Sequence, residues 1–178
     1  GGLTNPPSSL PTHTAAELSL CDGVRYRLAG ADAISQAIVA QVAQVMMLDP
    51  RGDRSRSACV PVVVRSGRKV DFHDSGGRLQ VTVVNPRNSP ELLASQMAHV
   101  ASSIVLDAER RGAVLLHGAL AERDGQGVVL AGPGMVGKTR VSRRLRSPWR
   151  SLSDDATLIV REPAGPYWAH PWPPWSRF

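Results

Sequence analysis

The stretch GVVLAGPGMVGKTRVSRRLRSPWRSLSDDATLIV, residues 127–160, places a glycine-rich turn, a lysine and a threonine ahead of two adjacent aspartates. Residues 132–139, GPGMVGKT, fit the pattern G-x-x-x-x-G-K-[ST] at every fixed position. The apolar run Val128–Leu130 precedes them, and we expect a helix to follow from about Lys138 to Arg146. A strand, a glycine loop and a helix in this order are the setting in which backbone N–H groups bind phosphate.

Each residue type in this pattern has a predicted role in holding a nucleotide. Glycines let consecutive backbone N–H groups point into one concavity, Lys138 places a positive charge at the β- and γ-phosphates, and Thr139 offers a hydroxyl to Mg²⁺. A chance match is the alternative, and the flanking strand and helix argue against it. The residues predicted to bind the phosphates are Gly132, Gly134, Met135, Val136, Gly137, Lys138 and Thr139.

Two further features of the sequence could belong to the same site. Asp154 and Asp155 begin 16 residues after Lys138, and adjacent carboxylates are costly to bury unless a cation lies near them. An Mg²⁺–nucleotide would supply that cation, whereas an ordinary Asp-Asp turn is the alternative.

His117 lies inside an apolar strand, where a lone histidine is usually a hydrogen-bonded core residue. Gly118 beside it would allow a close backbone approach, which favours a site.

The composition limits the class of protein. The chain has 178 residues, of which 42% are hydrophobic, which suits one domain or one domain with a small extra lobe. No apolar run approaches the roughly 18 residues of a membrane span. The net charge is +6, but the arginines are dispersed and no aromatic residues lie among them, so we expect no nucleic-acid partner. Cys21 and Cys59 are interpreted as free thiols of a cytoplasmic protein, with one disulfide as the alternative.

The order of the segments predicts a mixed α/β protein. Residues 1–20 are interpreted as a flexible lead-in, 21–110 as an N-terminal α/β segment that packs on the core, and 111–178 as the nucleotide-binding core. All four tryptophans fall in the last thirty residues, and we expect them to pack against a part of the protein beyond Phe178. The predicted elements are an edge strand at 24–28, strands at 60–64, 79–84, 113–121, 127–131 and 156–160, and helices at 33–47 and 90–110.

The residues LLHGALAERDGQGVVLAGPGMVGKT, 115–139, and WRSLSDD, 149–155, resemble the catalytic core of HPr kinase/phosphorylase. The resemblance covers about residues 113–160 and implies a mixed β-sheet, P-loop kinase core related to phosphoenolpyruvate carboxykinase. It implies that ATP and Mg²⁺ bind and that a serine is the acceptor. The terminal HPWPPWSRF, 170–178, resembles one subgroup, the SynChlorMet cassette protein ScmC, which implies a ribosomally made peptide as acceptor.

The resemblance also implies catalytic roles. Lys138 would neutralise phosphate charge, and Thr139 and Asp155 would hold Mg²⁺. Asp154 would take the proton from the serine hydroxyl, with His117 nearby to tune it, although spacing alone leaves open which aspartate does which. A homo-oligomer would also be compatible with this family.

The sequence departs from the family in two ways. The family continues well past the aspartate pair, so we expect a C-terminal part to be missing here. Pro133 removes one backbone donor from the glycine loop. A second hypothesis is therefore a catalytically incomplete, nucleotide-binding regulator or partner protein of a peptide-modification cassette. A DNA-binding protein is a third, supported by charge alone.

Overall fold

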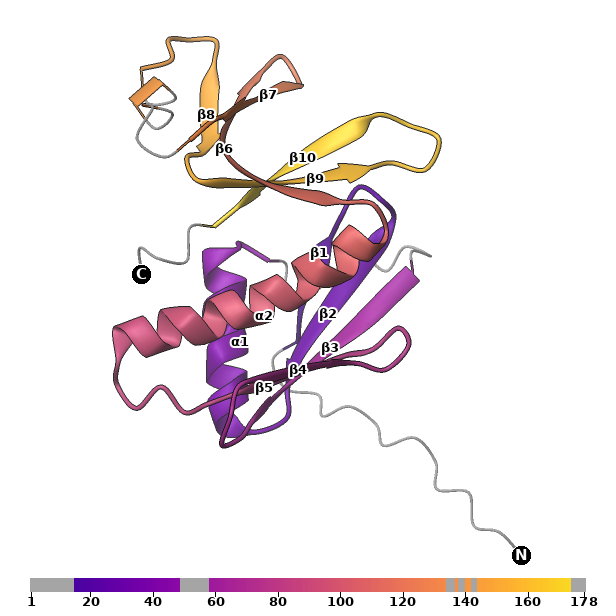
Figure 1. The fold of residues 1–178 in the computed structure, drawn as a ribbon, viewed down its shortest axis with the longest axis vertical. Coiled ribbons are helices and arrows are strands. Elements are labelled where there is room, and N and C mark those ends of the chain that lie inside the picture. The colour runs from indigo at the N-terminus through magenta and orange to yellow at the C-terminus, as the bar shows by residue number, and fades with distance from the viewer. Residues whose placement is uncertain (1–14, 49–57, 134–136, 138–139, 142–143, 174–178) are drawn as a thin grey trace, which may run out of the picture.

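The computed structural model describes residues 15–48, 58–133, 137, 140–141 and 144–173 of the chain. They form two β-sheets and two helices, α1 (Ala33–Val45) and α2 (Pro90–Arg110), and Figure 1 shows the second sheet lying across α2 from the first. The prediction of a mixed α/β protein is thus confirmed. Within the described residues, no helix has the length and apolarity that crossing a membrane would require.

The first sheet has the strand order β1-β2-β3-β5-β4. β1 (Ala15–Ser19) runs antiparallel to β2 (Val24–Gly30), which runs parallel to β3 (Ala58–Ser66). β5 (Leu79–Val83) is parallel to β3, and the short β4 (Asp71–Asp74) closes the edge in the antiparallel sense. Because it contains both kinds of pairing, this is a mixed sheet.

The prediction that residues 24–28 form an edge strand is wrong, because β1 pairs with β2 and makes it an interior strand. β1 falls within residues 1–20, which composition assigned to a lead-in. Tyr26 and Leu28 are fully buried, whereas Arg27 is exposed. Alternating basic and apolar residues therefore indicate a sheet with one buried face and one exposed face. They do not indicate an edge strand. Glu17 of β1 compensates the charge on the open face by pairing with Arg25 at 3.3 Å.

Both predicted helices form where their capping residues indicate. Asp32 caps α1, since its Oδ1 accepts the amide of Ser35 at 3.0 Å while Ser35 Oγ accepts the Asp32 amide. The other carboxylate oxygen accepts the amide of Ser66 at the end of β3, at 2.7 Å. Ser89 caps α2, and Pro90 stands at its first turn.

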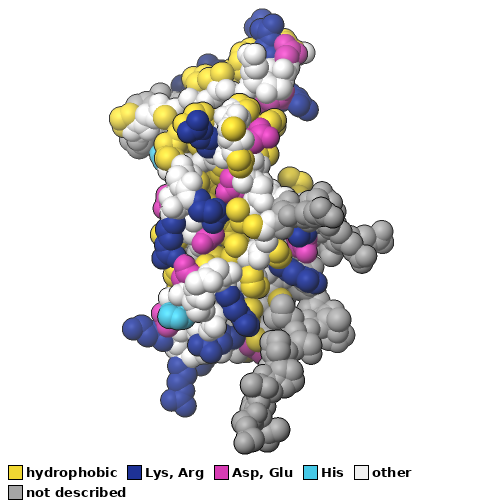
Figure 2. Space-filling view, turned by 90° about the vertical axis from the view of Figure 1, so that its right-hand side faces the viewer, with side chains coloured by type: hydrophobic (Ala, Val, Ile, Leu, Met, Phe, Trp, Pro, Cys, Tyr) yellow, Lys and Arg dark blue, Asp and Glu magenta, His cyan; other side chains and the backbone are white. Residues whose placement is uncertain are grey.

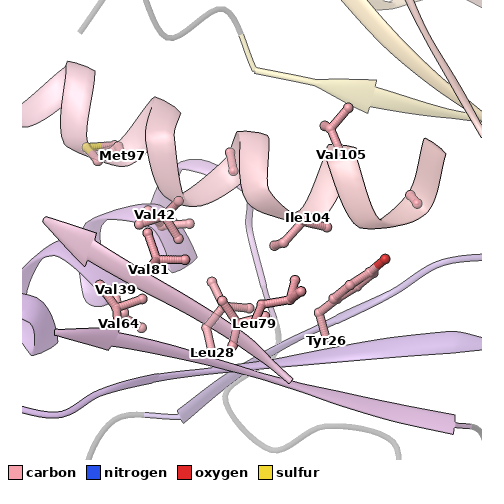
Figure 3. Packing of buried hydrophobic residues seen from close by; sticks show 14 of the residues in the cluster. Tyr26, Leu28, Val39, Val42, Val64, Leu79, Val81, Met97, Ile104 and Val105 are labelled. Atoms are coloured by element: carbon pink, nitrogen blue, oxygen red, sulfur yellow. The ribbon is translucent and has the colours of Figure 1, made fainter. Parts of the chain in front are cut away.

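The core is one apolar cluster with α2 at its centre (Figure 3). Met97 and Ile104 of α2 and Val42 of α1 pack against the first sheet, to which Val81 of β5 belongs. Val105 points from α2 toward the second sheet (Figure 3). The members contributed by the second sheet are Leu158, Val160 and Trp172.

The second sheet has the order β10-β9-β6-β7, with β8 also paired to β6. All of its pairings are antiparallel. Asp124 and Gly125 both have positive φ, 52° and 78°, and form a tight Asp-Gly hairpin turn between β6 and β7. The strands are β6 (Val114–Arg123), β7 (Gln126–Ala131), β8 (Arg150–Ser153), β9 (Ala156–Arg161) and β10 (Tyr167–Trp172).

Trp172 on β10 is only 4% exposed and packs within the described chain.

The predicted helix from Lys138 to Arg146 is shorter than expected. Arg140 and Val141 are helical, whereas Leu145 and Arg146 are not. The amide of Arg144 donates to the carbonyl of Val141, three residues back at 3.0 Å, which is a tightened final turn before Ser147-Pro148.

Charged side chains are spread over the surface. On the face drawn in Figure 2, Lys and Arg side chains run along the length of the molecule with Asp and Glu between them. Cys21 and Cys59 are free thiols, which confirms the predicted state of the two cysteines.

We predict that Asp32→Ala lowers the free energy of unfolding by about 1–3 kcal/mol. The variant loses the helix cap and leaves the Ser66 amide without its acceptor. Urea denaturation at pH 7 measures the change. Asp32→Asn keeps a capping oxygen and should lose less; an equal loss in both variants would contradict the capping account.

Stability should also depend on His170, whose Nε2 accepts the backbone amide of Cys21 at 3.4 Å. Burial lowers the pKa of His170, an effect that the Asp22 charge opposes. The unfolded chain therefore binds a proton more readily, so stability is fully present above the ordinary histidine pKa of about 6.5 and falls as pH drops below it.

Unfolding free energies measured between pH 7.5 and 5 should show a smaller loss in His170→Gln than in the wild type. His73→Gln, at an exposed position on β4, serves as the control and should keep the wild-type slope. Identical slopes in His170→Gln and the wild type would refute this role of His170.

Candidate functional site

The candidate site is organised by the middle of β6, which has a neighbour on each side. On one side, Gly118 is paired with Ala131, the last residue of β7 and the residue before the glycine loop. On the other side, His117 is paired with Ala156, the first residue of β9. Asp154 and Asp155 occupy the break between β8 and β9, and the Gly118 amide donates to the Asp155 carbonyl at 2.9 Å.

His117 is not a core residue. Its side chain is 62% exposed, and its Nδ1 lies 3.5 Å from Oδ1 of Asp155, whose side chain is 33% exposed. The strand is apolar in sequence, but Leu115 and Val114 are also exposed, so this end of β6 lies near the surface. The structure therefore brings two of the predicted site residues together, one from β6 and one from the break between β8 and β9.

Two hydroxyl groups hold the aspartate pair in place. Thr157 is fully buried, and its Oγ1 donates to the carbonyl of Gly118 at 3.2 Å. Ser153 Oγ donates to the carbonyl of Ala156 at 3.0 Å and lies 3.3 Å from Thr157 Oγ1. These residues flank the aspartates in SDDAT, 153–157. The sequence thus shows a hydroxyl residue on each side of the pair, a signal that the predicted set of site residues did not include.

The glycine at 118 is required by close packing. A Cβ at this position would lie 2.9 Å from Val129 Cγ1 and 3.0 Å from the Leu130 carbonyl oxygen of β7. The hairpin strands can therefore approach this closely only if residue 118 lacks a side chain. This is the close backbone approach that the His-Gly pair predicted.

The described part of the glycine loop begins at the end of β7, beside the middle of β6. Gly132 directly follows Ala131, and Gly137 has φ of +94°, a backbone conformation that glycine adopts without strain. The Val141 amide donates to the Gly137 carbonyl at 2.9 Å, so a helical turn starts at the end of the loop. The predicted residues Gly134, Met135, Val136, Lys138 and Thr139 lie outside the described residues.

Asp154 and Asp155 line different cavities, which share Trp172 and Pro173 as walls. Asp154 lines a cavity of about 420 Å³ that reaches the end of α1, and Asp155 lines one of about 410 Å³ beside α2. No group of three or more His, Cys, Asp and Glu side chains gathers as a metal site in the described ranges. A Mg²⁺ bound with a nucleotide does not need one, because it takes one or two carboxylates and the phosphates.

We predict that Gly118→Ala lowers the free energy of unfolding by about 1–3 kcal/mol, because the added methyl group must push β7 away from β6. Thermal or urea unfolding measures the loss. Gly127→Ala, on β7, is the matched control, since its Cβ would lie 3.5 Å from Leu120 Cδ1, an ordinary contact. Equal losses in the two variants would show that the packing at Gly118 is not special.

Comparison with known proteins assigns the chain to a family. No curated protein sequence shows significant similarity to the chain. A family model described as SynChlorMet cassette protein ScmC matches residues 81–178, more than half of the chain. The matched residues run from β5 through α2 and the second sheet, and they include every residue predicted for the site. The chain belongs to the family of SynChlorMet cassette proteins ScmC.

Proposed function

We propose that this protein is a Mg²⁺–ATP-dependent kinase of the HPr kinase type that phosphorylates a serine of a protein or a ribosomally made peptide. One observation carries the proposal. β6 lies between the strand that leads into the glycine loop and the chain segment that bears the two aspartates, and His117 on β6 contacts Asp155. The strand that leads into the glycine loop and the segment that bears the two aspartates are therefore both neighbours of β6.

The residues of the site fit Mg²⁺–ATP in their chemistry. Gly137 has positive φ and its carbonyl accepts the Val141 amide, and a helix that starts after such a glycine would offer backbone N–H groups and its positive end to an anion. Adjacent carboxylates that are partly exposed are suited to a divalent cation with oxygen ligands. When bound, Mg²⁺–ATP supplies the phosphoryl group and the charge that balances these carboxylates.

Each residue of the site then has its own role in the proposed reaction. Residues 132–139 would hold the phosphates, with the Lys138 ammonium as a point charge, and Thr139 and Asp155 would hold the metal. His117 contacts Asp155 across the strands and is a positioning residue for that carboxylate. Asp154 would accept the proton of the serine hydroxyl, because it faces a different cavity from Asp155.

A nucleotide-binding regulator without transferase activity is the second candidate. Pro133 favours it, because proline has no N–H and so leaves one donor fewer in the glycine loop. Such a protein would use the same loop to bind Mg²⁺–ATP, and the nucleotide would change its affinity for a partner protein of the peptide-modification cassette. The two candidates agree on nucleotide binding and differ on transfer to serine.

We predict that Lys138→Ala abolishes Mg²⁺-dependent ATP binding, because the phosphates lose their cation. Asp154→Asn should keep ATP binding but lower phosphate transfer about 100-fold or more, since it removes the general base. Calorimetry with Mg²⁺–ATP and transfer from γ-labelled ATP to a pool of serine-containing peptides measure the two quantities. Asp124→Asn is the matched control, because Asp124 is 76% exposed in a hairpin turn that also suits asparagine.

Wild-type protein that binds no ATP in the presence of Mg²⁺ would refute both candidates. Binding without transfer to any peptide in the pool would favour the regulator. Transfer that persists in Asp154→Asn and is lost in Asp155→Asn would keep the kinase and exchange the roles of the two aspartates.

A further inference from the structure

Strand β7 has a free edge, because β6 is its one neighbour among the described strands. Gly118 of β6 shows which backbone groups point to that edge. It is paired with Ala131 of β7, but its amide donates to the Asp155 carbonyl and its carbonyl accepts the Thr157 hydroxyl. Both polar groups of Gly118 therefore point away from β7. This makes Gly118 and Ala131 a pair without mutual hydrogen bonds, in which the amide and carbonyl of Ala131 point away from β6.

The free edge of β7 carries none of the usual obstacles to further pairing. The hydrogen-bonding pattern repeats every second residue, so Gly127 and Val129 also direct their backbone groups to this edge. Proteins commonly block such an edge with charged residues or proline. The edge strand β4 contains two aspartates and β10 contains Pro171, whereas the sequence of β7, QGVVLA, has neither a charge nor a proline. β7 is therefore open to an extended peptide that binds as a further strand.

A cavity of about 390 Å³ lies beside this edge. Gly127 and Val129 line it from β7, and Ile159, Tyr167 and Trp168 line it from β9 and from the start of β10. The β7 residues that line the cavity are the same alternate residues whose backbone groups point to the free edge. Side chains directly opposite each other on paired strands lie on the same face of a sheet. A strand added to β7 would therefore direct every second side chain toward this cavity.

The walls of the cavity suit one large uncharged side chain. Glu122 is the acidic residue among the described residues that line it, and its carboxylate accepts Arg150 Nε at 2.8 Å and the Gly125 amide at 2.7 Å. Tyr167 is 69% exposed and Trp168 is 44% exposed, so their rings are accessible to a ligand. The volume lies at the lower end of the range for small-ligand pockets, about 300–1,000 Å³. A phenylalanine or leucine side chain fits this chemistry and this volume.

We propose that an extended peptide binds along the free edge of β7 as an added strand, with one large apolar side chain in this cavity. That side chain lies opposite Gly127. The peptide residue four positions away, about 13 Å along the strand, then lies opposite Ala131, where β7 ends and the glycine loop begins. The identity of this residue rests on the proposed kinase function, under which it is the acceptor serine. The strand pairing itself serves a kinase and a regulator alike.

A peptide fits this edge better than a second copy of the chain. Two copies that paired β7 with β7 would offer to the cavity only the side chains on the same face of the strand, those of Gly127, Val129 and Ala131. These are too small to fill a cavity of about 390 Å³. A separate peptide can present a larger side chain at the same place.

Backbone-methylated peptides test the strand pairing independently of catalysis. Fluorescently labelled peptides of Thr and Gln would carry one Phe and one Ser four positions apart, and fluorescence polarisation with the 178-residue chain would measure their affinities. Replacing the Phe with Gly should weaken binding about tenfold or more, because the burial of a large apolar side chain is lost. Methylation of an amide nitrogen that bonds to β7 should weaken binding about tenfold, whereas methylation of the next amide should leave it unchanged. Effects that do not alternate along the peptide would overturn the added strand.

Two variants at one position of β7 locate the peptide on the edge. Val129→Pro removes an amide that points to the free edge and keeps the hydrogen bonds between β7 and β6, as proline on an edge strand allows. Val129→Ala keeps the amide and is the matched control. Peptide binding should be about tenfold weaker in Val129→Pro than in Val129→Ala. Equal affinities in the two variants would place the peptide elsewhere and overturn the proposal.

A charge at the rim of the cavity tests where the large side chain enters. Tyr167→Glu should weaken binding of the Phe peptide, and it should tighten binding of a peptide with Lys in place of Phe about two- to fivefold. That gain cannot arise from misfolding. Leu106→Glu, at a leucine on α2 that is 46% exposed and lies outside this cavity, is the matched control. No gain in Tyr167→Glu, or the same gain in Leu106→Glu, would overturn the assignment of the cavity.

Phosphate transfer from Mg²⁺–ATP to the same peptides separates this proposal from the kinase proposal. Binding that alternates with methylation, without any transfer, would support the added strand and count against the kinase. Transfer that depends neither on methylation nor on the distance between Phe and Ser would keep the kinase and overturn the added strand. No binding of any peptide, with or without Mg²⁺–ATP, would also overturn it. A wild-type dimer that Val129→Pro converts to a monomer in sedimentation would assign the edge to a second copy instead.

Discussion

The close approach of β7 and of the aspartate segment to Gly118 on β6 is the constraint on which the site depends. The backbone of β6 at this residue is paired with Ala131 and donates to the carbonyl of Asp155. A side chain here would collide with Val129 and with the Leu130 carbonyl. Because both neighbours are bound to the same residue, the start of the glycine loop and the aspartate pair are fixed relative to each other through backbone hydrogen bonds. These bonds are independent of side-chain conformation, which gives the rigidity that positioned catalysis requires.

Helix α2 extends this rigidity to the rest of the molecule. Met97 and Ile104 bury against the first sheet, and Val105 lies toward the second. The fully buried Leu158 of β9 belongs to the same cluster. The sheet that bears the site therefore cannot shift far without opening the core of the other half. The link between the Cys21 amide and His170 adds a polar contact between the two sheets at their edge. The cavity beside Asp154 exists because of this packing, since its walls come from both sheets.

The elements that sequence predicted well carry strong local signals. Asp32, Ser89 and Pro90 fix the starts of both helices, and Asp124-Gly125 fixes the hairpin. The missed strands lack such signals, because β1 follows a segment rich in proline and serine, β4 and β8 are each four mostly polar residues, and β10 contains Pro171. Proline is tolerated in β10 because this strand is at the edge of its sheet. The exposure of His117 was missed for a similar reason. The local sequence pattern shows how apolar a strand is. Which part of the strand is buried depends on the segments that pack against it, and these lie far away in the chain.

Placing the aspartates is a harder problem, because their adjacency in sequence suggested a shared environment. In the structure they lie where the extended chain breaks between β8 and β9, and they line separate cavities on the two sides of Trp172 and Pro173. Asp155 has His117 beside it, while Asp154 lines the cavity at the end of α1. Identical side chains thus meet different surroundings, and two carboxylates of one site can take different roles when their surroundings differ.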